Sequence, residues 1–524
     1  MKKQLIKTGI MLGLSAGLFL TACDDIDPVV DSLNFNRYLA PVGIEASLSK
    51  IVELTLTWTA VPNASSYYVE IYKDSLQFDE ANLIYRENVS TNRLQYSPLI
   101  GDTHYSARIK IAAGVKEESK WNWIVFQTSV DSKFLTAEAG DIGSDYAIFR
   151  WPAGMSATKI SLTPTSGAKI TQELNAQEIA EGKVQVEGLQ PSMKYTATLY
   201  DDNWRVGLTD VTTLKAGTII VRPEDDFRTL LETAADSTAF MLLPGDYISD
   251  GANIALTKSI FISGYGENLQ PVIHCQFTIA TPKVSLSLTN VEMNGIGASN
   301  SYSYFVQANS AEKAELGNIV VEGCRIKNYS RSLLAMGSSG NSSIESFTVN
   351  NSIIENIEAS GGDFVDVRVG LIKKLTITNS TFNKCAWARC FLRMDDPAAN
   401  FPGQKTEVLI DRCTFYGVTD VETGQSLLHV RVKESAVKMT NCIVAKTKGT
   451  LAHSKDDMTP ECGGNNYFDA PNFLSATANT TAISPDAKFD SSAATRLDPE
   501  FADADNGDFT VTNANVKVGD PRWF

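Results

Sequence analysis

The sequence predicts an all-β protein in which two small β-sandwiches precede a solenoid of stacked parallel strands. Residues 37–216 hold short strand-like runs such as VELTLTW and SYYVEIY, separated by turn signals such as VPNASS, which is the spacing of β-sandwiches. Further on, one short motif recurs at intervals of 33, 28, 28, 33 and 29 residues. Its equivalent positions are Val291, Cys324, Ser352, Ser380, Cys413 and Cys442. A repeat of this length indicates a solenoid with three short strands in each coil.

The first residues carry an export signal. Lys2, Lys3 and Lys7 precede the apolar run GIMLGLSAGLFL, which is too short for a spanning helix and is typical of a secretory signal. The following Leu-Thr-Ala-Cys, ending at Cys23, resembles the lipobox of bacterial lipoproteins. This resemblance implies a signal peptide over 1–22 and acylation of Cys23; an ordinary cleaved signal is the alternative.

An acidic stretch follows the lipidation site and forms a tether over 23–36. Its start, DDIDP, resembles the tag that sends lipoproteins of glycan-degrading Gram-negative bacteria to the outer face of the outer membrane. We therefore expect a lipid-anchored protein that faces the cell exterior and contacts the membrane through its lipid alone. Other glycan-uptake proteins at the cell surface are expected partners.

The two sandwiches are predicted over 37–130 and 131–216. Leu99, Thr103 and Tyr105 follow a Leu-x-x-x-Thr-x-Tyr pattern, and LQPSMKY at 189–195 has the Leu-x-Pro-x-x-x-Tyr form. Both resemble the tyrosine corner of fibronectin type III modules. Trp58 and Trp151 close equivalent strands in the two halves. The resemblance implies spacers or binding platforms, and neither half shows a catalytic constellation.

The solenoid is predicted over 217–524. A short helical pattern, FRTLLET, is followed by LLPGDY and ISGYG, which together resemble the opening turn of pectate-lyase-like right-handed parallel β-helices. The ending, from LDPEF to GDPRWF, resembles the closing segment of β-helix lipoproteins of polysaccharide-utilisation systems. The predicted fold class is therefore all-β, with two fibronectin type III-like sandwiches and a pectin-lyase-like β-helix.

The repeat also predicts columns of stacked side chains. Asparagine precedes the Val, Cys or Ser position in four of the six repeats, at 290, 351, 379 and 441. This pattern predicts an asparagine ladder whose amides bond along the solenoid axis. The Cys/Ser column should be buried and unpaired, although Cys413 and Cys442 could approach each other on adjacent coils. Phe382 and Phe415 should stack beside it.

Composition excludes several functions. The net charge of −15, from 46 basic and 61 acidic residues, argues against a nucleic-acid partner. Seven cysteines remain besides Cys23; an odd number confined to the solenoid is a poor disulfide framework, and no spacing predicts a zinc site. The presence of only four histidines argues against a histidine-rich metal centre.

Three predicted strands carry charge at alternate positions. They are FVDVRV at 364–369, CFLRMD at 390–395 and LLHVRV at 427–432. Counting from the repeat places them on successive coils of one sheet, where equivalent residues stack about 4.8 Å apart. One outward column is then Asp366, Arg393 and His429, and the next is Arg368, Asp395 and Arg431.

Two interpretations of these columns remain open. In the first, Asp366–Arg393 and Arg368–Asp395 are cross-strand ion pairs on a solvated face. In the second, His429, Arg431 and Lys433 lack an acid in their own coil and Arg389 adds a cation, so that a local basic cluster docks an acidic sugar.

The leading prediction is a protein that binds polysaccharide. If the basic cluster docks an acidic sugar, this polysaccharide is acidic and pectin-like. The substrate-binding candidates are Asp366, Arg368, Arg389, Asp395 and Arg431. A polysaccharide lyase is the alternative, with His429, Lys433 and Arg393 as catalytic candidates: an arginine, or a calcium ion held by Asp366 and Asp395, would neutralise the uronate, and His429 or Lys433 would remove the C5 proton. A structural stalk without ligand is the third possibility. Calcium is the one cofactor left open.

Overall fold

A computed structural model describes residues 36–49, 52–266, 270–310, 312–337, 342–357, 361–421, 425–453, 459–474 and 488–524. The predicted signal peptide, Cys23 and nearly all of the tether lie outside these residues. The chain divides into two compact units between Asp131 and Ser132. No helix of the described residues is long and apolar enough to cross a membrane.

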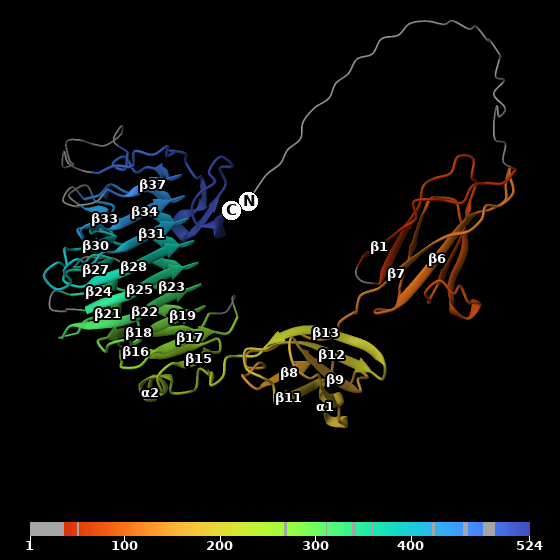
Figure 1. Ribbon diagram of the computed structural model, residues 1–524, viewed down its shortest axis with the longest axis horizontal. Helices are drawn as coiled ribbons and strands as arrows, with labels where there is room; N and C mark the ends of the chain where they lie inside the picture. The colour runs from red at the N-terminus through yellow and green to blue at the C-terminus, as the bar shows by residue number, and fades with distance from the viewer. Residues whose placement is uncertain are drawn as a thin grey trace, which may run out of the picture. The chain divides into compact units, whose positions relative to one another are not determined.

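The first unit is a β-sandwich of two antiparallel sheets (Figure 1). One sheet has the order β1-β2-β5 and the other β4-β3-β6-β7, the arrangement of a fibronectin type III module. The elements are β1 (Glu45–Ser49), β2 (Glu53–Thr57), β3 (Tyr67–Tyr72), η1 (Glu80–Asn82), β4 (Leu83–Val89), β5 (Arg93–Tyr96), β6 (His104–Ile111) and β7 (Asn122–Gln127). Trp58 and Tyr67 meet edge to face in its core, with ring centroids 5.2 Å apart.

The second sandwich repeats this arrangement at the start of the second unit. It pairs β11 with β8 in one sheet and has the order β10-β9-β12-β13 in the other. Its elements are β8 (Tyr146–Arg150), β9 (Lys159–Pro164), β10 (Ile170–Glu173), α1 (Ala176–Glu181), β11 (Lys183–Glu187), β12 (Lys194–Asp201) and β13 (Trp204–Thr212). Trp151 lies fully buried in the core.

Both predicted tyrosine corners are present. The backbone N–H of Ile100 donates to the Tyr105 hydroxyl at 2.8 Å, and the N–H of Gln190 donates to the Tyr195 hydroxyl at 2.8 Å. Each tyrosine ring is buried. The hydroxyl therefore satisfies a backbone donor at the point where the chain crosses between sheets.

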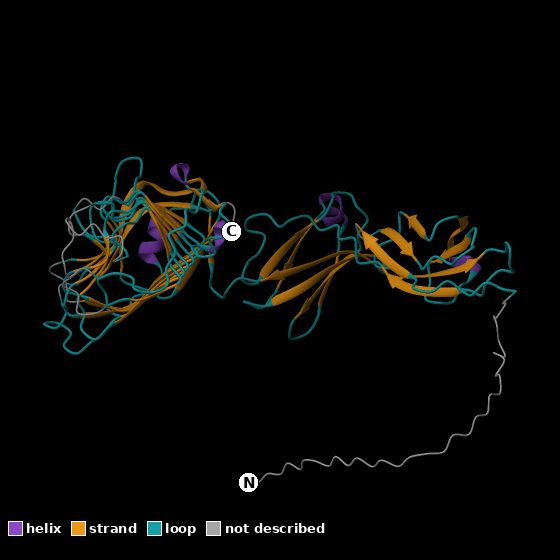
Figure 2. Ribbon diagram, turned by 90° about the horizontal axis from the view of Figure 1, so that it is seen from above, coloured by secondary structure: helices purple, strands orange, loops and turns teal. Residues whose placement is uncertain are grey.

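The rest of the second unit is a parallel β-helix whose coils contribute one strand to each of three faces. Figure 1 shows the strands stacked in chain order, and Figure 2 looks along the stack. The first face comprises β14 (Ile219–Val221), β15 (Thr238–Leu242), β17 (Ile260–Gly264), β19 (Leu286–Thr289), β22 (Ala314–Glu322), β25 (Ser342–Asn350), β28 (Leu371–Thr378), β31 (Glu407–Asp411), β34 (Ala436–Thr440) and β37 (Glu461–Gly463).

The other two faces join at β18 (Val272–Ile279), which pairs with the first strand of each and with β16 (Asp246–Leu256). The second face comprises β20 (Glu292–Asn294), β23 (Arg325–Lys327), β26 (Ile353–Glu355), β29 (Thr381–Asn383), β32 (Thr414–Tyr416), β35 (Ile443–Ala445) and β38 (Asn466–Phe468). The third comprises β21 (Tyr304–Ala308), β24 (Ser332–Met336), β27 (Val365–Val367), β30 (Leu392–Met394), β33 (Ser426–Val430) and β36 (Thr450–Ala452). These faces and the two sandwiches confirm the predicted fold class.

The interior of the β-helix is one continuous apolar core. The predicted cap helix, α2 (Phe227–Thr233), closes its first coil, with Phe227 packed edge to face against Phe240 and Tyr247. Phe382 and Phe415 stack as predicted, with centroids 5.1 Å apart and an angle of 11° between the rings. Equivalent residues of successive coils therefore stack through their side chains in the core as well as through their paired backbones.

The asparagine column marks the turn between the first and second faces. Asn290, Asn351, Asn379 and Asn441 all have positive φ, between 48° and 58°. Asparagine and glycine tolerate this left-handed conformation better than other residues do, which explains their recurrence.

The predicted bonding of this ladder needs a correction. The amides do bond along the axis, but their partners are not one another. Asn379 Nδ2 donates to Asn350 Oδ1 at 2.8 Å, and Asn441 Nδ2 donates to Asp411 Oδ1 at 2.8 Å. In both cases the acceptor is the residue that precedes the turn position of the preceding coil, whereas Asn290 Nδ2 donates to the backbone oxygen of Gly266 at 3.3 Å.

The Cys/Ser column is buried as predicted, and every cysteine of the described residues is a thiol. Its hydroxyls accept backbone N–H groups across coils: Cys324 N donates to Ser352 Oγ at 3.0 Å, and Ser352 N donates to Ser380 Oγ at 3.1 Å. Burial raises the pKa of the Cys324 thiol to about 12. The cysteines of this column are core residues, and the thiolate form of Cys324 is suppressed.

The C-terminal segment folds back onto the coils. It contains β39 (Phe501–Asp503), η2 (Ala504–Asn506), β40 (Asp508–Val511) and η3 (Pro521–Trp523). Thr381 Oγ1 donates to Asp520 Oδ2 at 2.7 Å and accepts from Trp523 Nε1 at 2.8 Å. The last residues are therefore fastened to β29 by a buried hydroxyl.

Candidate functional site

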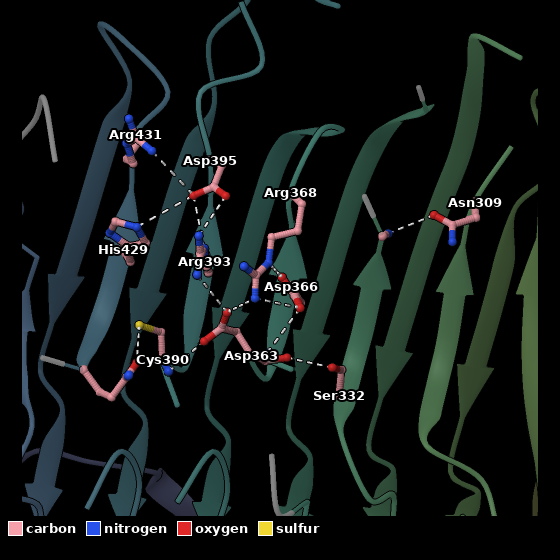
Figure 3. Close-up of polar contacts among 12 residues, drawn as sticks. Asn309, Ser332, Asp363, Asp366, Arg368, Cys390, Arg393, Asp395, His429 and Arg431 are labelled. Carbon is pink, nitrogen blue, oxygen red and sulfur yellow. Dashed lines mark hydrogen bonds and ion pairs between the residues drawn. The ribbon is translucent and has the colours of Figure 1, made fainter. Parts of the chain in front are cut away.

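The charged strands lie on the third face in the predicted register. Asp366 on β27 pairs with Arg393 on β30, which pairs with His429 on β33. Figure 3 shows these side chains, together with Arg368, Asp395 and Arg431, gathered on one side of neighbouring strands. We call these six residues the charged row.

The ion pairs within the row differ from those predicted. Arg393 forms a fork on Asp395, two residues along the same chain segment, with Nε–Oδ1 at 3.1 Å and Nη2–Oδ2 at 2.9 Å. Arg368 likewise bonds Asp366 on its own segment. Side chains two positions apart project from the same face of a strand, so long guanidinium groups reach these carboxylates as easily as those across the strands. The predicted cross-strand pairs are therefore wrong.

A buried aspartate joins the two pairs, and the sequence interpretation missed it. Asp363 is only 1% exposed. Its Oδ2 accepts from Arg368 Nη2 at 2.7 Å and lies 3.6 Å from Arg393 Nη1, while its Oδ1 accepts from the N–H of Cys390 at 3.0 Å. Asp363 precedes β27 and stands three residues before Asp366. A pattern with a period of two assigns these residues to opposite faces of the strand, so the sequence interpretation did not include Asp363 in the outward columns.

Burial sets the electrostatics at Asp363. Loss of solvent, together with the nearby charge of Asp366, raises the pKa of its carboxyl, although Arg368 and Arg393 act in the opposite direction. Burial opposes the charge on Arg368, but its bond to Asp366 raises the pKa of the guanidinium overall. Arg368 therefore stays charged and tied to two acids.

Arg431 and His429 lie close to an acid of the neighbouring coil, Asp395, although their own coil offers none in the predicted columns. His429 Nε2 lies 3.7 Å from Asp395 Oδ1, and Arg431 Nη1 lies 4.0 Å from the same oxygen. His429 is 6% exposed, and its ring centroid lies 4.3 Å from that of His453. The side chain of Arg431 is 43% exposed. Arg431 is thus the open end of the row, and His429 is largely covered.

Two of the predicted residues lie outside the row. Lys433 lines a separate pocket of about 170 Å³ with Asp396, Phe401 and Lys405. Arg389 lies in the loop before β30, where its backbone N–H donates to Ala386 O at 3.1 Å. The structure therefore brings together six of the eight predicted site residues and adds Asp363.

The site is balanced in charge rather than basic. Three acids, Asp363, Asp366 and Asp395, face three arginines, which corrects the predicted basic cluster. Asp366 and Asp395 are each occupied by a guanidinium, so they do not form the calcium site considered above. Among the residues that the structure describes, no group of three or more His, Cys, Asp or Glu side chains could hold a metal ion.

Comparison with known proteins divides the β-helix into two matched stretches. Residues 245–384 match the family "Domain of unknown function (DUF4957)", and residues 408–523 match "Domain of unknown function (DUF5123)". No curated protein matches the chain. Asp363, Asp366 and Arg368 fall in the first stretch, and His429 and Arg431 in the second. Arg393 and Asp395 lie between them.

Solved structures similar to the chain include fibronectin type III segments. A two-domain segment of chicken tenascin is 15% identical, covering 33% of this chain and 99% of that chain with a TM-score of 0.23. The FN1–FN3 domains of chicken CNTN1 are 16% identical, covering 34% and 68% of the two chains with a TM-score of 0.15.

Proposed function

We propose that this protein is a surface lipoprotein that binds polysaccharide through the third face of its β-helix, as part of a glycan-uptake system. The observation that carries the proposal is the charged row: carboxylates and guanidiniums from β27 and β30 hold one another in fixed positions, and Arg431 extends the row beside β33. Groups fixed in this way lose little side-chain entropy when a ligand binds.

Fixed donors beside fixed acceptors suit the hydroxyl groups of sugars. A hydroxyl both donates and accepts hydrogen bonds, so neighbouring hydroxyls can bond a carboxylate of Asp366 or Asp395 and an adjacent guanidinium. The strands repeat about every 4.8 Å along the axis, which presents similar groups to successive units of a polymer. A repeating ligand such as a polysaccharide matches a repeating surface.

Charge balance makes a polyhydroxylated sugar the expected ligand of the row. An acidic sugar would have to compete for the fork of Arg393 with Asp395, which already occupies it at 2.9 Å. Arg431 is the exception, because the Asp395 oxygen beside it is 4.0 Å away and much of its side chain is exposed. A uronate would therefore be expected at that end of the row.

The rival function, uronate cleavage by β-elimination, requires a base that the sugar can reach. His429 is nearly buried and Lys433 lies in another pocket. The geometry therefore favours binding over turnover. The N-terminal anchor, through Cys23 in the outer membrane, completes the proposal by holding the binding face at the cell surface.

Electrophoresis of the chain from residue 24 onward through gels containing polygalacturonate or a neutral β-glucan tests this function. We expect retardation by at least one polymer and no ultraviolet-absorbing unsaturated product. Arg431→Ala should reduce the retardation, whereas Lys194→Ala, which removes an exposed charge paired with Asp210 in the second sandwich, should not.

Accumulation of the unsaturated product would replace this proposal with the lyase. If the wild-type chain migrates freely through both polymers, the proposal is refuted and a stalk without ligand becomes the better description.

A further inference from the structure

Another pocket lies beside the C-terminal hairpin, near the turns that lead from the second face to the third. It has a volume of about 300 Å³ and is lined by Lys384, Trp387, Tyr416, Gly417, Asp420 and Lys446. This volume is at the lower end of the range of small-molecule sites, roughly 300–1,000 Å³. None of its residues belongs to the charged row.

Trp387 gives the pocket an exposed aromatic surface. Its side chain is 58% exposed, whereas the other aromatic ring of the pocket, Tyr416, packs against Phe509 at a centroid distance of 5.3 Å. An indole offers a large, rigid apolar face at low entropic cost. The apolar face of a ring-shaped ligand can stack on it.

The polar groups around the pocket fall into two sets. Lys446 is engaged: its Nζ lies 3.3 Å from the Tyr416 hydroxyl and 3.7 Å from Asp505 Oδ1. Lys384 is exposed and bonds the backbone oxygen of Asp505 at a long 3.5 Å. Asp420 is half-buried, which raises the pKa of its carboxyl. Lys384 can therefore donate hydrogen bonds to a ligand, and the Asp420 carboxylate can accept them from its hydroxyls.

We propose that this pocket binds one pyranose unit of a polysaccharide, with the sugar ring on the indole of Trp387 and its hydroxyls bonded to Lys384 and Asp420. A pyranose has an apolar face of C–H groups and a polar rim of hydroxyls. It matches a pocket with one open aromatic face and a few polar side chains. This inference rests on the proposed function, because it supplies a further contact for the same polymer.

The chain connects the pocket directly to the charged row. Trp387 and Arg393 are six residues apart, a span of at most about 22 Å in an extended chain. The segment between them contains Cys390, whose N–H bonds Asp363. One glycan chain of modest length can therefore contact both the row and the pocket, and the two contacts would strengthen each other's binding.

The test compares Trp387→Ala with Trp123→Ala, since Trp123 is similarly exposed, at 51%, on the first sandwich. Both variants are made in the chain from residue 24 onward. The affinity of each for polygalacturonate and for the neutral β-glucan is measured by electrophoresis through gels containing the polymer, and tryptophan fluorescence is recorded in a parallel titration. We expect Trp387→Ala to weaken binding roughly tenfold, as for a tryptophan at the centre of a binding site, and to abolish the fluorescence change. Trp123→Ala should alter neither.

Lys384→Ala provides a second measurement, because an exposed lysine is removed without disturbing the fold. It should weaken binding of the same polymer severalfold. If both Trp387→Ala and Lys384→Ala keep the affinity of the wild type, and the polymer still retards the wild type, the pocket does not bind the sugar. The proposed function of the charged row would then still stand. A wild type that neither polymer retards overturns the pocket and the proposed function together.

Discussion

The hydroxyl of Thr381 should hold the C-terminal segment on the β-helix, and Thr381→Val isolates its contribution. Valine has nearly the same shape, so packing in this fully buried position changes little. The substitution removes two bonds, one to the Asp520 carboxylate at 2.7 Å and one from Trp523 Nε1 at 2.8 Å. A bond to a charged group contributes about 1.5–3 kcal/mol and a neutral one about 0.5–1.5 kcal/mol.

The expected cost follows from what remains. Arg522 Nε still pairs with Asp520 Oδ2 at 2.8 Å, so the carboxylate keeps one partner and the loss should be about 2–4 kcal/mol. Hydrogen exchange read by mass spectrometry on peptides from residues 499–524 measures this loss as a lower opening free energy of the segment.

Thr196→Val is the matched control. Thr196 Oγ1 donates to Asp210 Oδ1 at the same 2.7 Å, but this bond is exposed on the second sandwich. Its loss should change stability by less than about 0.5 kcal/mol. If exchange in 499–524 is the same in Thr381→Val as in the wild type, the buried hydroxyl does not fasten the segment and the reasoning fails.

Four other changes test the remaining conclusions. Arg393→Ala should weaken polysaccharide binding by about 1–3 kcal/mol in titration calorimetry. Arg393→Lys should recover only part of this binding free energy, because lysine lacks the forked guanidinium. Lowered stability with unchanged binding would mean that the row is a solvated structural surface that binds no ligand. Asn379→Gly should be tolerated in thermal unfolding, whereas Asn379→Val should cost about 1–3 kcal/mol, because a branched residue is strained at positive φ; equal melting temperatures would contradict this. Burial raises the pKa of the Asp520 carboxyl above 3.8, so the folded state binds this proton more tightly. The protonated Asp520 carboxyl therefore stabilises the fold fully below about pH 3.8, and this stabilisation is lost as the pH rises through the pKa of the folded state. In Asp520→Asn the denaturant midpoint should no longer fall with rising pH over this range. Cys23→Ser should abolish incorporation of labelled fatty acid and release the protein from membranes, and a labelled, membrane-bound variant would exclude the lipoprotein assignment.

Repetition made much of this fold predictable. A motif that recurs every 28 to 33 residues places equivalent residues on neighbouring coils, and the strand period of two decides which side chains point outward. The alignment of Asp366, Arg393 and His429 follows from these two regularities. The tyrosine corners were predictable for a similar reason, since each joins a tyrosine to backbone only five residues away.

Tertiary structure decided which charged groups pair. Arginine has several rotatable bonds, so Arg393 can reach an acid on its own strand or on a neighbouring strand. The sequence pattern does not distinguish these two ion pairs. The choice depends on Asp363, which lies outside the alternating pattern and draws Arg368 and Arg393 toward a common buried carboxylate.

The pocket beside Trp387 was beyond sequence reasoning for another reason. Apart from Tyr416 at the end of β32, its lining residues come from turns of successive coils, at 384–387, 417–420 and 446, and turns lie outside the strand period that orders the rest. The sequence by itself determined the coils, their register and the outward columns, because these depend on backbone repetition. Only the folded chain decided the charge balance of the row and the shape of the pocket, because these depend on side-chain reach and on loops that meet in space.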